Sequence, residues 1–129
     1  MIVVDTSVWI DFYNGTLDDR TRRVRDLVGS GTLLMGDLIA CEILQGVRDE
    51  AEAVRVRERI ETLPVASMVG PAIALQAARN YRILRGQGFT IRRTIDLLIG
   101  TFCIEHHHYL IHNDRDFRPM VEHLGLQEA

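Results

Sequence analysis

A chain of 129 residues is about the length of one domain, and no linker or repeat divides it, so we predict a single domain over residues 1–129. With 47% hydrophobic and 26% charged residues and only 3 prolines, the composition excludes a disordered, collagen-like or disulfide-stapled chain. The formal charge of −3 gives no argument for a nucleic-acid partner, and the absence of lysine excludes a P-loop phosphate clamp and Schiff-base chemistry.

The apolar segments indicate a protein outside the membrane. Runs such as Leu97–Thr101 are far too short to cross a bilayer, so no membrane partner is expected. Met1–Val4 leads into Asp5 without a basic segment, so we expect no secretory signal and a cytoplasmic protein. Cys41 and Cys103 lack CxxC spacing and lie among apolar residues, which predicts buried free thiols in a reducing compartment.

The first half of the chain alternates short apolar runs with helical patterns. Thr6 and Ser7 are suited to cap the first helix, and Asp37 to cap the third. In chain order the predicted elements are a strand at Met1–Val4, a short helix over Val8–Tyr13, a helix within Leu17–Val28, a strand at Thr32–Met35, a helix from Asp37 to about Gly46 and a helix at Asp49–Thr62.

The second half continues the same alternation. Pro71 opens one predicted helix, Thr94 caps another, and Gly125 is placed to end the last. In chain order the predicted elements are a strand at Val65–Val69, a helix at Pro71–Leu84, a helix from Ile95 to about His106, a strand at Tyr109–Ile111, a loop at Asn113–Phe117, a helix at Pro119–Leu124 and a short strand at Leu126.

This order predicts an α/β fold with a mainly parallel central sheet and helices on both faces. In such a sheet the functional crevice lies beyond the carboxyl ends of the strands. Asp5 directly follows the first predicted strand, and Asp114 closely follows the fourth. The sequence therefore predicts two carboxylates at the same edge of the sheet.

Most acidic residues lie in segments of mixed charge, but four lie in or just after apolar segments: Asp5, Glu42, Asp96 and Asp114. Glu42 is the only charge in Leu38–Leu44, and Asp96 is the only charge in Thr94–Ile99. A carboxylate in apolar surroundings is costly unless it is compensated, and converging carboxylates raise one another's pKa or bind a cation. Oxygen ligands select Mg²⁺ or Mn²⁺, and such an ion suits phosphodiester hydrolysis.

Each acid taken alone also has a structural explanation. Asp5 could cap the helix that follows it, and Asp96 could favour the positive end of its helix or pair with Arg92 or Arg93. Glu42 could bind an arginine from another helix, and Asp114 or Asp116 could be a turn residue. The four acids together, two of them at strand ends, favour a shared site.

Four segments in order resemble the motifs of PIN-domain nucleases. They are Val4–Asp11 with Asp5, Ala40–Gly46 with Glu42, Thr94–Gly100 with Asp96, and Leu110–Phe117 with Asp114 and Asp116. Length, motif order and spacing resemble the VapC-type toxins of bacterial toxin–antitoxin pairs across essentially the whole chain. The resemblance implies a PIN-like three-layer sandwich and an Mg²⁺-dependent endoribonuclease, with Mn²⁺ as a substitute, that cleaves RNA and is neutralised by a small antitoxin.

The resemblance also implies roles for individual residues. Asp5 and Asp96 carry over as metal ligands, with Asp114 as the third, and Glu42 completes the acidic pocket. Asp116 is an auxiliary candidate. A hydroxyl of Thr6 or Ser7 would hold the carboxylate of Asp5, and His112 stands where many relatives have a Thr or Ser.

Two kinds of partner follow from the same resemblance. Arg92, Arg93 and Arg115 lie beside the acidic motifs, where they could bind RNA phosphates or neutralise neighbouring acids. The apolar segments Leu38–Leu44 and Val8–Tyr13 could form a groove for an antitoxin helix, and a homodimer is typical of the family.

Three rival interpretations remain at this point. A receiver-like signalling domain shares the α/β plan and an acidic Mg²⁺ pocket, but it usually needs a lysine, which this chain lacks. A catalytically inactive PIN fold would act only as a binding module, against which the intact acidic set argues. A nuclease that cleaves DNA would carry the same acids.

Overall fold

The computed structural model describes residues 1–129 and contains one parallel five-stranded sheet. The strand order is β3-β2-β1-β4-β5, so the first strand lies in the centre. The strands are β1 (Ile2–Val4), β2 (Leu33–Gly36), β3 (Val65–Ala66), β4 (Tyr109–Ile111) and β5 (Gln127–Glu128). Val4 pairs with Ile111, and the backbone N–H of Asp5 donates to the carbonyl of Ile111 (2.9 Å). The segments that leave β1 and β4 are therefore neighbours at one edge of the sheet.

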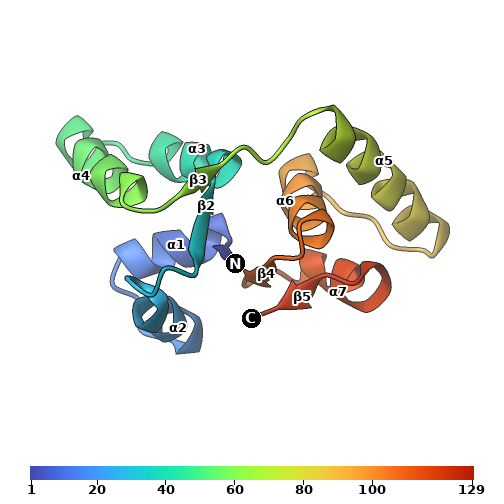
Figure 1. Ribbon diagram of the computed structural model, residues 1–129, viewed down its shortest axis with the longest axis horizontal. Helices are drawn as coiled ribbons and strands as arrows, with labels where there is room; N and C mark the ends of the chain where they lie inside the picture. The colour runs from blue at the N-terminus through green and yellow to red at the C-terminus, as the bar shows by residue number, and fades with distance from the viewer.

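The helices form two groups, one on each side of the strands (Figure 1). The group drawn in blue to green comprises α1 (Thr6–Tyr13), α2 (Asp19–Leu27), α3 (Asp37–Gln45) and α4 (Glu50–Glu61). The group drawn in olive to red comprises α5 (Pro71–Gly86), α6 (Thr94–Glu105) and α7 (Arg118–Leu124), with a short 3-10 turn η1 (Arg115–Phe117) before α7. The predicted α/β fold with helices on both faces of a parallel sheet is confirmed.

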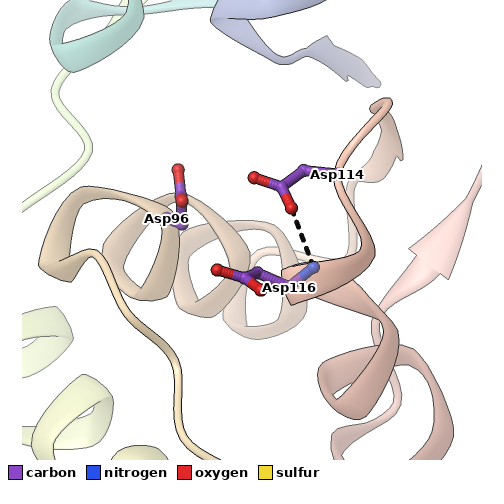
Figure 2. Close-up of side chains that lie close together, drawn as sticks. All are labelled: Asp96, Asp114 and Asp116. Carbon is purple, nitrogen blue, oxygen red and sulfur yellow. Dashed lines mark hydrogen bonds between the residues drawn. The ribbon is translucent and has the colours of Figure 1, made fainter.

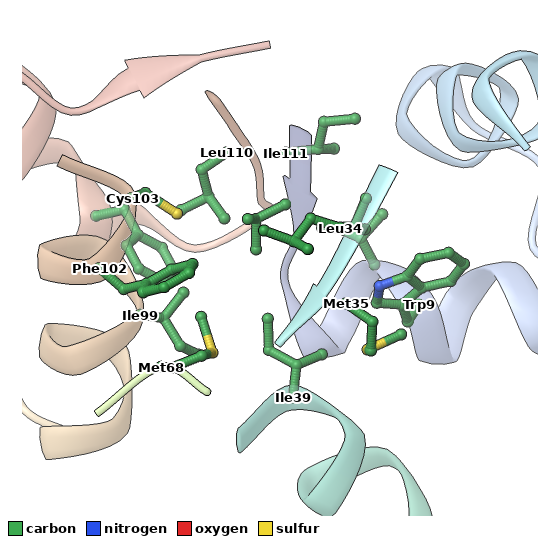
Figure 3. Close-up of a cluster of buried hydrophobic side chains, with 14 of the residues drawn as sticks. Trp9, Leu34, Met35, Ile39, Met68, Ile99, Phe102, Cys103, Leu110 and Ile111 are labelled. Carbon is green, nitrogen blue, oxygen red and sulfur yellow. The ribbon is translucent and has the colours of Figure 1, made fainter. Parts of the chain in front are cut away.

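The core lies between the sheet and these two helix groups (Figure 3). The central strands are apolar on both faces, as expected for a parallel sheet covered on both sides, and Val3, Val4, Leu110 and Ile111 are all buried. The largest side chains without exposure to solvent include Phe117, Met35, Ile39, Met68 and Ile99. In this packing α6 lies against β4 and α3 lies against β2.

Several element boundaries differ from the prediction. Asp37 and Thr94 are the first residues of α3 and α6 rather than their caps, so the N-cap positions fall on Gly36 and Arg93. β3 is shorter than the predicted Val65–Val69, and the last strand begins after Leu126. Two further boundaries also change: α5 extends to Gly86, and the predicted loop Asn113–Phe117 contains η1.

The cysteine prediction is half wrong. Cys103 is buried, but Cys41 is exposed. α3 buries Ile39 and Ile43, which share one face of the helix, and Cys41 lies midway between them and so faces away. Both cysteines are free. No helix in the structure combines the length and apolar character needed to span a bilayer.

Candidate active site

The site begins at the end of β1, where Asp5 is the N-cap residue of α1. Asp5 is buried, and its side chain does not cap the helix. The hydroxyl of Ser7 instead donates to Asp5 Oδ2 (3.1 Å). Burial raises the pKa of Asp5, and the hydrogen bonds from Ser7 and from the backbone of Thr6 partly oppose this rise.

Glu42 reaches the same place from α3. The hydroxyl of Thr6 donates to Glu42 Oε1 (2.6 Å), and Arg93 Nη2 donates to Glu42 Oε2 (2.7 Å). Of the two hydroxyls expected to support Asp5, only that of Ser7 does so, because Thr6 holds Glu42. Both oxygens of Glu42 are therefore engaged.

Asp96 lies in the first turn of α6 and is 4% exposed. Its Oδ2 atom is buried without a hydrogen-bond partner, and the nearest cation is Arg93 Nε at 3.9 Å. Burial raises the pKa of Asp96 to about 6; Arg93 opposes the rise, while Asp5, Asp114 and Glu42 add to it. A buried carboxylate oxygen that accepts no hydrogen bond and lies among other acids is suited to bind a cation.

Asp114 and Asp116 approach Asp96 from the segment after β4 (Figure 2). The backbone N–H of Asp116 donates to Asp114 Oδ1 (2.9 Å), which closes a tight turn before η1. The backbone N–H of Asp114 donates to Nδ1 of His112 (3.3 Å), and His112 Nε2 lies 2.9 Å from Glu128 Oε2. The imidazole thus holds the backbone of Asp114, in the position where relatives were expected to carry a hydroxyl.

One open cavity of about 250 Å³ lies between β1, α3, α6 and the segment after β4, and Asp116 does not line it. Its lining includes the four predicted acids together with Thr6, Ser7, Ile10, Gln45 and Arg93. The tightest set of carboxylates is Asp96, Asp114 and Asp116, whose ligand atoms all lie within 4.8 Å of one another. Asp5 lies outside this tight set but lines the same cavity. The structure brings together Asp5, Glu42, Asp96 and Asp114 and places Asp116 directly beside them.

The donor set of this cavity fits a hard divalent cation. All candidate ligands are carboxylate oxygens, which favour Mg²⁺ or Mn²⁺. Asp96 Oδ2 gives a further reason for a cation, because a buried carboxylate oxygen that accepts no hydrogen bond is destabilising and Arg93 Nε approaches it only to 3.9 Å.

Two of the three arginines proposed for RNA are engaged by acids. Arg92 binds Asp116 through two nitrogens, and Arg93 binds Glu42. Their side chains are nevertheless 75% and 59% exposed. Arg115 is exposed and makes no ion pair.

Sequence reasoning missed three contributors to the site. Gln45 lies one helical turn after Glu42, and this spacing could have revealed it. Arg20 donates through Nε to the carbonyl of His112 (2.7 Å), and Glu128 contacts the ring of the same histidine. These two contacts join residues 92 and 16 positions apart, and no local sequence signal reports them.

The family model described as "PIN domain" matches residues 2–121 of the chain. The chain belongs to the PIN-domain family. Among curated relatives, the VapC ribonuclease Mb1587 of Mycobacterium bovis and ribonuclease VapC11 of Mycobacterium tuberculosis are each 33% identical over 132 residues, which covers 100% of this chain and 98% of the relative. This identity over the full length makes the chain a PIN-domain protein of the VapC ribonuclease family.

Solved structures share the PIN fold at lower identity. VapBC2 from Rickettsia felis, crystallised with a DNA fragment from its promoter, aligns with a TM-score of 0.78 and 16% identity, covering 100% of this chain and 98% of that one. VapBC-1 from nontypeable Haemophilus influenzae aligns with a TM-score of 0.76 and 23% identity, covering 100% and 97%. The predicted PIN-like three-layer sandwich is confirmed, and the receiver-like interpretation is not supported.

Proposed function

We propose that this PIN-domain protein is a metal-dependent endoribonuclease and the toxin of a toxin–antitoxin pair. One observation carries the catalytic part. Carboxylates from the end of β1, from α6 and from the segment after β4 line one cavity, and the buried Oδ2 of Asp96 has no hydrogen-bond partner there. The names of the curated relatives as VapC ribonucleases support RNA as the substrate.

In this proposal Asp5, Asp96 and Asp114 bind Mg²⁺, which Mn²⁺ can replace. When bound, such an ion lowers the pKa of a water for attack on the phosphorus and stabilises the charge that develops on the phosphate oxygens. Cleavage releases a 3′-hydroxyl and a 5′-phosphate. Glu42 lines the same cavity, where its carboxylate can orient the attacking water or accept its proton.

The remaining residues position these groups. Ser7 fixes the carboxylate of Asp5, and Thr6 fixes that of Glu42. The exposed guanidinium groups of Arg92, Arg93 and Arg115 would bind phosphates that flank the cleaved bond.

The partner proposal rests on a groove beside α1 and α3. Its apolar lining includes Ile10, Tyr13, Ile43 and Val56, and its volume is about 280 Å³. An amphipathic antitoxin helix would bury apolar side chains there. The structural relatives that are VapBC complexes support such a partner. We further propose a homodimer, a single domain over residues 1–129 and a cytoplasmic location.

The test is cleavage of matched RNA and DNA strands by the purified chain with Mg²⁺ or Mn²⁺ and with EDTA. We expect RNA cleavage that requires the ion and is abolished in D5N and in D96N, both of which should retain the wild-type far-UV circular dichroism spectrum. D26N, which removes an exposed carboxylate of α2, serves as the control and should cleave normally. Full activity in D5N or D96N would refute the site, and cleavage of DNA alone would refute the substrate.

A further inference from the structure

The five carboxylates of the site differ in how many of their oxygens are already engaged. Asp5 accepts one hydrogen bond from a side chain, at Oδ2, and the side chain of Asp114 accepts one, at Oδ1. Asp96 accepts none. Glu42 and Asp116 have both oxygens bound. Oxygens that remain available to a cation therefore belong to Asp5, Asp96 and Asp114.

The two oxygens of Asp116 are bound by one guanidinium group. Arg92 Nε donates to Oδ2 (3.1 Å), and Arg92 Nη2 donates to Oδ1 (3.3 Å). This two-point geometry is the strong form of an arginine–carboxylate contact. The hydrogen bond to Asp116 raises the pKa of Arg92, and the nearby charges of Asp114 and Asp96 add to the rise. Arg92 is therefore a permanent positive charge at this acidic group.

Asp96 and Asp114 belong to two overlapping sets of acids. They line the cavity together with Asp5 and Glu42, and their ligand atoms lie within 4.8 Å of that of Asp116. Two-ion nuclease sites place ions about 3.5–4 Å apart with carboxylates between them. Asp5 and Asp96 keep carboxylate oxygens without a hydrogen bond, whereas both oxygens of Asp116 are held by Arg92. An ion therefore finds available ligand oxygens beside Asp5 rather than beside Asp116.

We propose that the guanidinium group of Arg92 takes the place of a second divalent ion, so that this chain binds only one. That ion lies against Asp5, Asp96 and Asp114, and Asp116 serves to hold Arg92 rather than to bind metal. The inference rests on the proposed function only in assuming the first ion. Because the Arg92 side chain is 75% exposed, its remaining N–H groups can reach a phosphate that enters the cavity.

The neighbouring arginine provides a matched control. Arg93 precedes α6 like Arg92 and is exposed to a similar degree, but its ion pairs are with Glu42 on α3 (2.7 Å) and Asp96 (3.9 Å). Removing its charge takes a cation away from Glu42 and Asp96 and frees neither oxygen of Asp116. R93M should therefore change the affinity of the first ion without adding a second.

The experiment is titration with Mn²⁺, followed by calorimetry and by the electron paramagnetic resonance signal of free Mn²⁺, up to millimolar concentration at neutral pH. We expect one bound ion in the wild type, one in R93M and one in D116N, but two in R92M. The double variant R92M/D116N should return to one, and D5N should lose the first ion. R92Q repeats the test with a polar side chain if R92M melts abnormally.

Four results would overturn the inference: two ions in the wild type, a single ion in both R92M and R92Q, a second ion that persists in R92M/D116N, or loss of the first ion in D116N rather than in D5N. Failure of the proposed function has a different signature, since the wild type would then bind no ion and cleave no RNA. If the wild type binds one ion and cleaves RNA, and R92M also binds only one ion, the inference about Arg92 is refuted. The proposed function then still stands.

Discussion

Replacing Asp96 by Asn should stabilise the metal-free protein while abolishing its activity. Asp96 is 4% exposed, and its buried Oδ2 has no hydrogen-bond partner. The charges that face it are those of Arg93, which favours its ionised form, and of Asp5, Asp114 and Glu42, which oppose it. At neutral pH the folded chain must therefore keep a carboxylate ionised in a place where ionisation is unfavourable.

The size of the effect follows from the pKa. Folding raises the pKa of Asp96 from 3.8 to about 6, and each unit corresponds to about 1.4 kcal/mol. Ionised Asp96 thus destabilises the folded state by up to about 3 kcal/mol above pH 6. Since Asn keeps an unpaired polar group at the same place, we expect D96N to raise the free energy of unfolding by about 1 to 3 kcal/mol.

The sign of the pH dependence is fixed by the direction of the shift. A carboxyl group whose pKa rises on folding destabilises the protein fully above the folded value, less as the pH falls through about 6, and not at all below 3.8. The advantage of D96N over the wild type should therefore be present at pH 7 and vanish near pH 4. Other carboxyl groups titrate in both proteins and cancel in the difference.

The assay is urea unfolding in EDTA at pH 7 and pH 4, with D26N as the control for loss of an exposed charge. Saturating Mn²⁺ should then stabilise the wild type, by about 2.7 kcal/mol at a hundredfold excess over Kd, and leave D96N unchanged. The reasoning fails if D96N is less stable than the wild type at pH 7 in EDTA, or if the difference between them is the same at both pH values.

Three further predictions concern binding and packing. Because Asp96 must lose its proton to bind a cation, Mn²⁺ affinity measured by calorimetry should fall about tenfold per pH unit below pH 6, and a constant affinity down to pH 5 would contradict this. A Cβ on Gly100 would lie 2.5 Å from the Cε atom of buried Met120. G100A should therefore lower the free energy of unfolding by about 1 to 2 kcal/mol, and adding M120V to G100A should restore it. An unchanged free energy of unfolding in G100A would argue against this close packing. The side-chain amide of Asn80 donates to the buried hydroxyl of Thr101 (3.1 Å). T101V should therefore lower the free energy of unfolding by about 1 to 3 kcal/mol, and T101S should lower it much less. Equal losses in the two variants would assign the effect to side-chain shape rather than to the hydrogen bond.

The sequence predicted the elements well because buried parallel strands are continuous apolar runs between helical patterns. The boundaries of these elements were harder to predict, because contacts with residues distant in the sequence decide them. β3 stops at Ala66 where the backbone N–H of Met68 donates to Asp37 Oδ1 (3.0 Å) instead of to a neighbouring strand. The N–H of Leu126 donates to the carbonyl of Met120, so this residue completes the end of α7 and the last strand begins after it.

The site acids were predictable for a similar reason. A lone charge in an apolar segment, such as Glu42 or Asp96, stands out in the sequence, and strand ends converge in a parallel sheet. The pairing of the arginines was not predictable. Arg92 and Arg93 are both about one turn before Asp96, yet Arg92 binds Asp116, and only the position of the segment after β4 decides between these partners.

The two outermost strands of the sheet, β3 and β5, are each two residues long. Such short edge strands offer few unpaired backbone N–H and C=O groups to a strand of another chain, which is one way in which proteins avoid pairing between sheets. We therefore expect any self-association of this chain to use side-chain surfaces, such as those of its helices, rather than the edges of the sheet. Substitutions intended to separate two copies belong on those outer helical surfaces, where they leave the central sheet and its catalytic edge untouched.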